Sequence, residues 1–460
     1  MGRTASKTST KIKSSNRKNL SRKNKHPKLP VTKSIAEYKN PLRQYHPATS
    51  VILAGYRSGL SEFSVKPPLF RTSTFEFVTS REGEKFFQRA YHLKGDDGKE
   101  PGLIYSRLNN PNVEIIEDKL VAAEKGSHYA LLFPSGMSAI TTTILALIPK
   151  GGRILYTDPV YGGSYLFFKD FCPKRFDIQT HPVDATQLKL LETHLKQLNR
   201  LDLFYIETPA NPTMRMVDIE ACRLLVKKYF PNCLVAVDNT FLGPVFQSPF
   251  EFGVDLVFYS ATKFLGGHSD LIAGVALFAE KSHYIATRDY RTILGNTPAP
   301  DTAWLLTRSI ETLWVRMERQ AEKASKIVNE IYQHPKIKWV GYPGLLEKLA
   351  KRQPSKHLLE QLKIYHKQCK GPGSMFSFEL KNSSRQASYR FLDHLRIFHL
   401  AVSLGGTESL IQHPRSMTHS DMSPEDLDRA QITEGLIRVS VGLESSDDLI
   451  QDIYQALEWV

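Results

Sequence analysis

Cysteine is scarce in this chain, because its 460 residues contain only four. Cys172, Cys222, Cys233 and Cys369 are widely spaced and form no CxxC pair. Such a set makes neither a disulfide framework nor a zinc motif of paired cysteines. We therefore expect a reducing compartment, the cytoplasm, and no bound metal.

Long hydrophobic runs and nucleotide-binding loops are also missing. The most apolar stretch, residues 129–148, is interrupted by Pro134, Ser135 and Gly136 and contains several threonines. This pattern suits a buried strand followed by a helix better than a membrane span, so we expect no membrane partner. The chain has no GxxxxGK[ST] loop and no GxGxxG, which argues against a nucleoside triphosphate or a dinucleotide as ligand.

Acidic residues are absent before Glu37, and this gap accounts for most of the net charge. The chain has 61 Lys and Arg against 47 Asp and Glu, a formal charge of +14. Eleven of the basic residues lie within residues 1–36, and without them the rest carries only +3. Nucleic acid is therefore not expected as a partner, except through this basic tail. The tail's composition predicts disorder, and its role could be that of a solvated extension, a transit peptide, or a polyanion-binding or localisation signal.

The rest of the chain divides by pattern into an arm, 37–100, and two domains, 101–307 and 308–460. In the first domain short apolar segments alternate with helical patterns, which predicts an α/β fold with a mostly parallel sheet. The predicted strands are 129–133, 153–156, 203–206, 234–237 and 256–259. Apolar residues then recur at spacings of three and four from Leu306 to Ile331, which predicts one long helix leading into a smaller α+β domain.

Residues suited to chemistry follow these strands directly. Asp238 ends one strand, Ser260 ends the next, and Lys263 comes shortly after it. Ligands of parallel sheets bind beyond the carboxyl ends of the strands, and a desolvated lysine there can become the neutral amine that an aldehyde needs. Residues 135–137 begin a predicted helix, whose free N–H groups favour a phosphate. Together with the tyrosine-glycine turn at 161–163, these groups meet the requirements of pyridoxal phosphate (PLP).

The same segments resemble the Cys/Met-metabolism enzymes of PLP fold type I, a family that includes cystathionine γ-synthase, cystathionine γ- and β-lyases and methionine γ-lyase. DLVFYSATKFLGGHS, residues 255–269, is similar to the family's cofactor-lysine signature throughout. Further matching segments occur in the family's order: IYSRLNNPN, PSGMSA, YGGSY, ETPANPTM, VDNTF, AVSLGGTESLIQHPRSMTH and LIRVSVGLE. The resemblance extends from Ser50 to Val460 and implies a PLP-binding large domain over 101–307 and a small domain over 308–460.

The resemblance implies a role for each matched residue. Lys263 would hold the cofactor's aldehyde and move protons, and Asp238 would keep the pyridine nitrogen protonated. Asn211 would face the phenolic oxygen of the cofactor, and Tyr161 would stack on its ring and assist the leaving group. The residues that would bind its phosphate are Ser135, Gly136, Met137, Ser260 and Thr262.

Substrate and subunit contacts are implied in the same way. Arg438, helped by Ser403, would bind the carboxylate of an amino-acid substrate. Tyr105 and Arg107 resemble the pair that reaches the phosphate of a neighbouring subunit, which implies a homo-oligomer: a dimer with shared active sites and typically a tetramer. Glu408 and His419 could line the substrate pocket, whereas we expect structural roles for His268 and Asp270.

The implied activity is that of a PLP-dependent carbon–sulfur lyase of trans-sulfuration. It would act at Cγ and eliminate a thiol from cystathionine- or methionine-like substrates, giving a 2-oxo acid and ammonia. The alternatives are cystathionine γ-synthase, which joins cysteine to an O-acyl homoserine, and cystathionine β-lyase. A non-catalytic protein of the same fold would lack the cofactor lysine, which is intact here, and a polyanion-binding protein would depend on the basic tail.

Several departures from the family's pattern bear on specificity. Methionine γ-lyases usually have a cysteine where this chain has Gly163 and an aspartate where it has Gly406, so both positions favour the cystathionine enzymes. SLGGTES looks more like the γ-specific members than the β-lyases. Asn112 often is a threonine in the family, Arg415 replaces an alanine, and residues 94–100 form a polar insertion. The last two could alter the pocket or the subunit contact.

Overall fold

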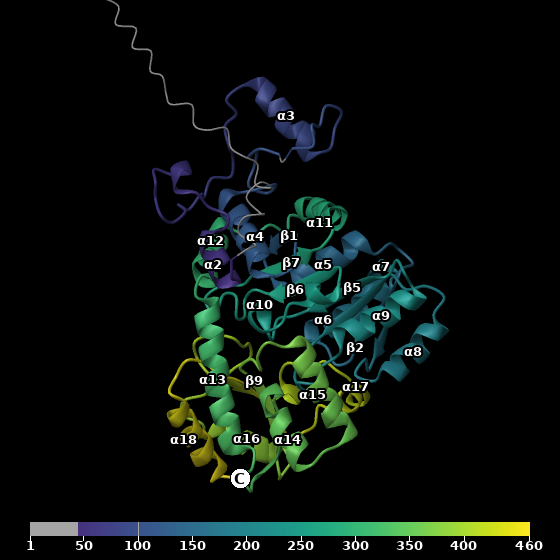
Figure 1. The fold of residues 1–460 in the computed structure, drawn as a ribbon, viewed down its shortest axis with the longest axis vertical. Helices are drawn as coiled ribbons and strands as arrows, with labels where there is room; N and C mark the ends of the chain where they lie inside the picture. The colour runs from purple at the N-terminus through teal and green to yellow at the C-terminus, as the bar shows by residue number, and fades with distance from the viewer. Residues whose placement is uncertain (1–44, 100) are drawn as a thin grey trace, which may run out of the picture. The chain divides into compact units, whose positions relative to one another are not determined.

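The computed structural model describes residues 45–99 and 101–460 (Figure 1). The basic tail, 1–36, lies outside these residues, as does the start of the predicted arm. These described residues all belong to one compact unit. The domain boundaries expected at 100/101 and 307/308 stay predictions.

A large sheet occupies the first half of this unit. Its strands are β1 (Tyr129–Phe133), β2 (Arg153–Thr157), β3 (Gln179–Val183), β4 (Leu203–Glu207), β5 (Leu234–Asp238), β6 (Leu256–Ser260) and β7 (Gly274–Phe278). They lie in the order β1-β7-β6-β5-β4-β2-β3, with β7 antiparallel to both its neighbours and β6 to β3 all parallel. The mostly parallel sheet and its five predicted strands are confirmed. β3, which is polar along most of its length, and β7 have no counterpart in the sequence prediction.

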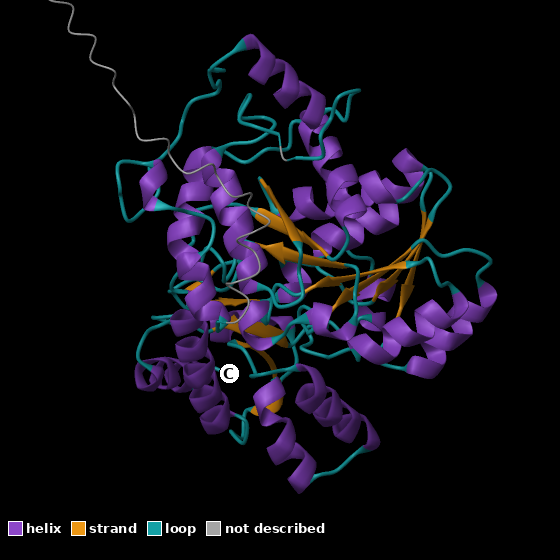
Figure 2. Cartoon of the chain, turned by 45° about the horizontal axis from the view of Figure 1, so that its top comes forward, coloured by secondary structure: helices purple, strands orange, loops and turns teal. Residues whose placement is uncertain are grey.

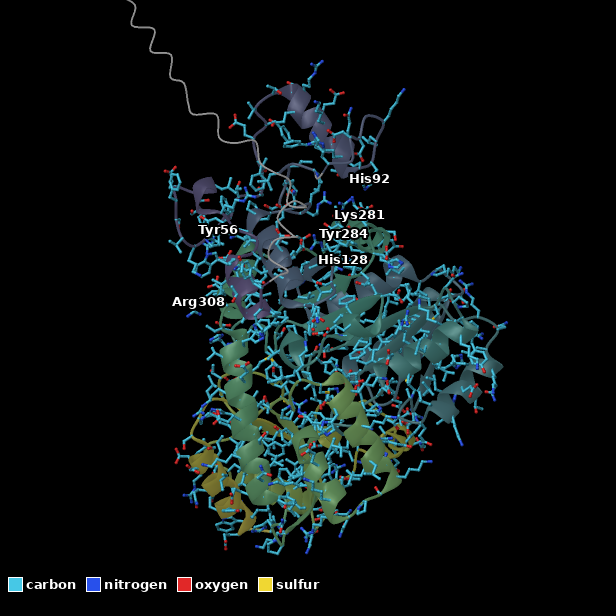
Figure 3. The ribbon with its side chains drawn as sticks, in the orientation of Figure 1. Tyr56, His92, His128, Lys281, Tyr284 and Arg308 are labelled. Atoms are coloured by element: carbon cyan, nitrogen blue, oxygen red, sulfur yellow. The ribbon has the colours of Figure 1, made fainter. Side chains whose placement is uncertain are left out.

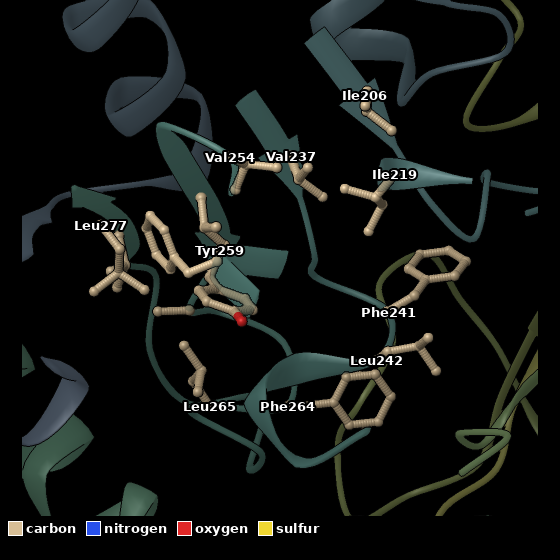
Figure 4. Close-up of a cluster of buried hydrophobic side chains, with 14 of the residues drawn as sticks. Ile206, Ile219, Val237, Phe241, Leu242, Val254, Tyr259, Phe264, Leu265 and Leu277 are labelled. Atoms are coloured by element: carbon tan, nitrogen blue, oxygen red, sulfur yellow. The ribbon is translucent and has the colours of Figure 1, made fainter. Parts of the chain in front are cut away.

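Alternate residues of these strands enter two hydrophobic cores, one on each face of the sheet. On β5, Val235 and Val237 belong to one core and Ala236 to the other. Figure 4 shows part of the first core, where Val237 lies with Ile206 and Leu277 of other strands. Helices cover both faces (Figure 2). A sheet covered twice needs apolar residues at every strand position, which explains the continuous apolar runs in the sequence.

The helices around the large sheet begin with α4 and end with α11. They are α4 (Pro111–Ala123), α5 (Gly136–Leu147), α6 (Gly162–Leu166), α7 (Cys172–Phe176), α8 (Leu188–Gln197), α9 (Ile219–Tyr229), α10 (Gly243–Phe246) and α11 (Lys281–Leu294). A π-helical turn, Phe167–Phe171, joins α6 to α7. α5 starts where the sequence predicts it, because Ser135 caps it by accepting a hydrogen bond from the N–H of Ser138 at 3.0 Å.

The prediction of one continuous helix over 306–331 is wrong. The structure has two helices, α12 (Pro300–Ile310) and α13 (Leu313–Ile331). Between them the carbonyl of Ser309 accepts from the side chains of Thr312 and Arg316, at 3.1 and 3.0 Å. The same carbonyl also accepts from the backbone N–H of Thr312 at 3.2 Å, as in a tight turn between the two helices. The predicted apolar stripe is buried on both helices.

A second sheet lies in the C-terminal part. Its strands are β8 (Ile337–Gly341), β9 (Met375–Leu380), β10 (His399–Leu400), β11 (Leu410–Gln412) and β12 (Leu436–Ser440), in the order β10-β11-β12-β9-β8. The helices here, besides α13, are α14 (Leu346–Arg352), α15 (Lys356–Gln368), α16 (Arg385–Asp393), α17 (Pro424–Arg429) and α18 (Ser446–Leu457). The smaller α+β part is therefore confirmed. No helix among residues 45–99 and 101–460 is long and apolar enough to cross a membrane.

The described part of the arm contains α2 (Pro47–Leu53) and α3 (Ser80–Ala90). The insertion after α3 is held by polar contacts: Arg89 binds Asp97 through two hydrogen bonds of 2.7 and 2.8 Å. His92 lies near α11, which carries Lys281 and Tyr284 (Figure 3), and its Nε2 is 3.1 Å from a guanidinium nitrogen of Arg288. The segment between α3 and the insertion therefore contacts α11 of its own chain.

Candidate active site

Four neighbouring strands of the large sheet end in polar residues at one edge. They are β6, β5, β4 and β2, which end in Ser260, Asp238, Glu207 and Thr157. Glu207 and Asp238 are partners in register, so their Cα atoms face each other across adjacent strands. Because parallel strands end together, this edge collects side chains from distant parts of the sequence.

Lys263 follows β6 by three residues and is partly buried. Its Nζ donates to Ser403 Oγ at 2.8 Å. Burial, and then the nearby charge of Arg438, lowers the pKa of Lys263 to about 8. Ser403 lies in the loop after β10 and has a φ of +89°, a left-handed conformation that costs a residue with a side chain about 1–3 kcal/mol. The local fold thus tolerates strain where it contacts the lysine.

Arg438 lies in the middle of β12 and is only 3 % exposed. Its guanidinium donates to Asn211 Oδ1 at 3.2 Å and to the carbonyl of Ser403 at 2.6 Å. With its amide oxygen turned toward these donors, Gln412 also accepts from Arg438 at 3.0 to 3.2 Å. Burial lowers the pKa of Arg438 to about 10. All these acceptors are neutral, so the buried positive charge is left for an anion.

Asp238 is buried and accepts three hydrogen bonds. Its Oδ1 accepts from the N–H and the hydroxyl of Thr240, at 3.0 and 2.6 Å, and its Oδ2 from the hydroxyl of Tyr205 at 3.2 Å. Burial raises the pKa of Asp238. It also raises the pKa of Glu207, to about 8, with the charge of Asp238 adding to the effect. A cation brought to this pair of carboxyl groups would be strongly stabilised.

The N-terminus of α5 lies against the end of β6. A Cβ on Gly136 would come within 3.0 Å of the Cβ of Ser260, so glycine is what allows the close approach. Ser260 in turn donates its N–H to Thr240 Oγ1 at 2.9 Å, and Thr262 is held by the carbonyl of Ala273 at 3.2 Å. The predicted phosphate-binding residues Ser135, Gly136, Met137, Ser260 and Thr262 are thus grouped around one helix N-terminus.

Tyr161 precedes α6, and its side chain is 44 % exposed. Its N–H donates to Glu207 Oε2 at 2.8 Å. Gly163 lets the tyrosine ring lie close to the chain, because a Cβ there would be 2.7 Å from the ring and 3.1 Å from Met137 Sδ. The Tyr161 turn therefore lies next to both the helix N-terminus and the strand ends.

Two predicted residues lie apart from this group in the single chain. Tyr105 and Arg107 belong to the segment after the arm, and Arg107 donates to the carbonyl of Thr292 at 2.8 Å. The guanidinium carbon of Arg107 lies 6.0 Å from the centre of the Tyr105 ring. Arg107 thus contacts the end of α11 rather than Lys263 or the α5 N-terminus. The structure thus does not bring them together with the other predicted site residues.

The sequence reasoning missed two residues of the site. Glu207 lies inside the ETPANPTM segment and ends a strand as Asp238 does, so the strand-end rule could have found it. Gln412 gives no signal of its own, because its partner Arg438 lies on another strand.

Two departures from the family's pattern now have a place in the structure. Arg415 forms ion pairs with Asp428 and Glu434, both at 3.0 Å, and contacts none of the site residues above. Glu408 accepts from Ser269, and a Cβ on Gly406 would lie 2.4 Å from the Glu408 carboxylate. The missing side chain at 406 therefore makes room for the carboxylate of Glu408.

His419 is fully buried, and burial lowers its pKa to about 3. The imidazole is therefore neutral at physiological pH. One of its nitrogens, Nδ1, lies 3.0 Å from Thr418 Oγ1. His419 thus contributes no charge beside Arg438.

The residues at this edge suit PLP in both charge and shape. Arg438, Asp238 and Glu207 are buried and Lys263 is partly buried, yet none of the four forms an ion pair within 45–99 and 101–460. Buried charges without partners are costly unless a ligand supplies the opposite charge. PLP would offer an aldehyde to Lys263, a pyridinium nitrogen to the buried acids and a phosphate to the helix N-terminus.

Comparison with known proteins agrees with this geometry. The family model described as "Cys/Met metabolism PLP-dependent enzyme" matches residues 48–458. L-methionine gamma-lyase of Fusobacterium nucleatum subsp. polymorphum is 37% identical over 420 residues, which cover 90% of this chain and 99% of that protein. Cystathionine gamma-lyase of Sus scrofa is 37% identical over 417 residues, covering 90% and 94%. The structure of cystathionine gamma synthase from Xanthomonas oryzae pv. oryzae, in complex with aminoacrylate and cysteine, superposes with a TM-score of 0.79 at 32% identity and covers 90% of this chain and 98% of its own.

Proposed function

The chain belongs to the Cys/Met-metabolism PLP-dependent enzymes, with their fold type I architecture, and from this membership we propose that it catalyses γ-elimination on a sulfur-containing amino acid. The products would be a 2-oxo acid, ammonia and a thiol. The observation that carries the proposal is the partly buried lysine Lys263, whose Ser403 partner also binds Arg438 through its carbonyl. This contact places an amine of lowered pKa next to a guanidinium whose hydrogen-bond partners are all neutral, as an amino-acid substrate requires.

Bound PLP supplies an aldehyde that condenses with amino groups and a ring that accepts electrons from the substrate. Asp238 would hold the proton at the pyridine nitrogen, because its buried carboxylate is stabilised by a cation there. The N–H groups at the start of α5, with the hydroxyls of Ser260 and Thr262, would bind the phosphate. Tyr161 and Asn211 would lie at the ring, one on its face and the other at its phenolic oxygen.

Lys263 is suited to move protons because its pKa of about 8 lies close to neutral pH. It would take the proton from the substrate Cα, give it up at the C4′ carbon of the cofactor and, as a neutral amine again, take one from Cβ, so that the γ-substituent can leave. Arg438 would hold the substrate carboxylate through two parallel hydrogen bonds, which fixes Cα over the lysine. Tyr161 would protonate the leaving thiolate.

A second candidate function is γ-replacement, in which a thiol adds at Cγ in place of elimination. The similarity to a cystathionine gamma synthase structure favours it. The relatives that are methionine and cystathionine gamma-lyases favour elimination, and they match this chain over nearly its whole length.

The oligomer belongs to the proposal as well. Tyr105 and Arg107 would complete the phosphate site of a neighbouring subunit in a dimer or tetramer, since they lie apart from the site in their own chain. Co-expression of Lys263→Ala with Arg107→Ala tests this idea. In a mixed dimer one of the two sites would take Lys263 from the Arg107→Ala subunit and Arg107 from the Lys263→Ala subunit, so activity should return. If each site were built from one subunit alone, the mixed dimer would stay inactive. The cytoplasmic location stays a prediction.

A substrate panel on one PLP-loaded preparation tests the reaction itself. We expect 2-oxo acid from cystathionine or methionine without any added thiol. Product formation only from an O-acyl homoserine with cysteine present would show a synthase instead. A three-carbon oxo acid formed from the cysteine half of cystathionine, with homocysteine as the thiol released, would indicate β-elimination.

A further inference from the structure

Glu207 is a buried acid that occupies the centre of the site without a cation of its own. It is 5 % exposed, ends β4, and faces Asp238 across the sheet. Its backbone N–H is bound to Thr157 Oγ1 at 3.0 Å, which fixes the strand end. Among the described residues its carboxylate takes part in no ion pair, and burial raises its pKa. Such a placement costs free energy, so the contacts of the carboxylate must repay it.

Both oxygens of this carboxylate accept hydrogen bonds from backbone N–H groups of two separate turns. Oε2 accepts from Tyr161 at 2.8 Å, and Oε1 accepts from Asn211 at 3.1 Å. The Tyr161 turn follows β2, and the Asn211 turn follows β4 itself. Only a carboxylate offers an acceptor on both of its terminal atoms, whereas a glutamine offers one acceptor and one donor. The residue type is therefore the one that these two N–H groups require.

The contacts continue from Asn211 to the proposed substrate arginine. Asn211 Oδ1 accepts from Arg438 at 3.2 Å, and Arg438 contacts the loop of Ser403. A shift of the Asn211 turn would thus move the guanidinium as well as the asparagine side chain. Glu207 is connected in this way to groups on three elements that meet around Lys263.

Glu379 shows what an ordinary buried glutamate looks like in the same chain. It lies on β9, is 2 % exposed, and accepts from Trp339 Nε1 at 2.7 Å. Unlike Glu207 it has a cation, Lys338, at 3.2 Å. Its contacts lie within the smaller sheet and its loops, so it serves as a matched control.

We propose that Glu207 is a positioning residue, which holds Tyr161 and Asn211 at the cofactor ring by accepting a hydrogen bond from each of their backbones. This inference rests on the proposed function, in which those two residues contact PLP. Glu207 touches neither substrate nor cofactor and acts only through the two turns.

The test compares Glu207→Gln with Glu379→Gln in the full-length protein, freed of cofactor and titrated with PLP. The glutamine side chain can accept from one N–H with its amide oxygen, but its NH₂ group faces the other N–H as a second donor. One of the two turns therefore loses its hydrogen bond. We expect the PLP dissociation constant to rise by roughly tenfold or more in Glu207→Gln, since a buried N–H loses its acceptor. The visible circular dichroism of the bound cofactor should change, because it reports the asymmetry of the ring's surroundings. Glu379→Gln should stay within about twofold of the wild type.

Glu207→Asp keeps a carboxylate but withdraws it by one methylene, and it decides the matter if Glu207→Gln does not fold. We expect a change in the same direction for both readouts. Wild-type affinity and dichroism in the Glu207 variants, or equal effects in Glu379→Gln, would overturn the positioning role while leaving the proposed function intact. Failure of the wild-type protein to bind PLP would overturn the proposed function and this inference with it.

Discussion

Replacing Arg438 by lysine tests whether the buried guanidinium binds the substrate carboxylate. Lysine keeps the positive charge but loses the planar fork, so a bidentate contact becomes a single one. One charge-assisted hydrogen bond contributes about 1.5–3 kcal/mol, and tenfold in affinity corresponds to about 1.4 kcal/mol. We therefore expect Arg438→Lys to raise KM for the amino-acid substrate about ten- to 150-fold. Because Lys263 and the residues at the α5 N-terminus are unchanged in this variant, PLP content should remain close to normal.

The matched control is Arg415→Lys, on the 3₁₀ turn Pro414–Ser416 that follows β11. Arg415 is paired with Asp428 and Glu434 and contacts none of the proposed site residues, so its replacement should change KM by less than about twofold. Steady-state kinetics at saturating PLP measure both variants. An unchanged KM in Arg438→Lys, or an equal rise in Arg415→Lys, would refute the assignment.

Three further predictions concern the cofactor. PLP uptake by the cofactor-free protein needs the neutral amine of Lys263, so its rate should rise with pH and level off above about pH 8, and a rate independent of pH below that value would contradict the lowered pKa. Asp238→Asn should lower kcat by roughly 10²–10³-fold, as expected when an electrostatic partner is lost. The melting temperature of the cofactor-free Asp238→Asn protein should not fall, since burial disfavours the Asp238 charge, and a large fall would indicate a structural role instead. Gly163→Ala places a Cβ 2.7 Å from the Tyr161 ring, so the visible dichroism of bound PLP should change, and an identical spectrum would argue against ring stacking by Tyr161.

The sheet could be predicted because its strands are buried on both faces. Continuous apolar runs identified β1, β2, β4, β5 and β6, whereas β3 lacks this signal because Gln179, Thr180 and His181 are polar. The break between α12 and α13 was not predictable from spacing alone. At the break the carbonyl of Ser309 accepts from the backbone of Thr312 and from the side chains of Thr312 and Arg316, and the apolar period records none of these contacts.

The site was predictable where a residue ends a strand or starts a helix. Asp238, Ser260, Lys263 and Ser135 follow that rule, since parallel strands deliver their carboxyl ends to one edge. Arg438 lies in the middle of β12 and entered only through the resemblance. Gln412 reaches Arg438 only because β11 pairs with β12 in the smaller sheet, and no local sequence pattern predicts that pairing.

The central claim is that Lys263, held between the strand ends and Ser403, is the residue to which PLP becomes attached. Borohydride reduction of the PLP-loaded protein, followed by peptide mass mapping, measures this directly. We predict a pyridoxyl group on the peptide that contains Lys263 and its loss in Lys263→Ala. A pyridoxyl group on another lysine, or no stable adduct in the wild type, would contradict the account.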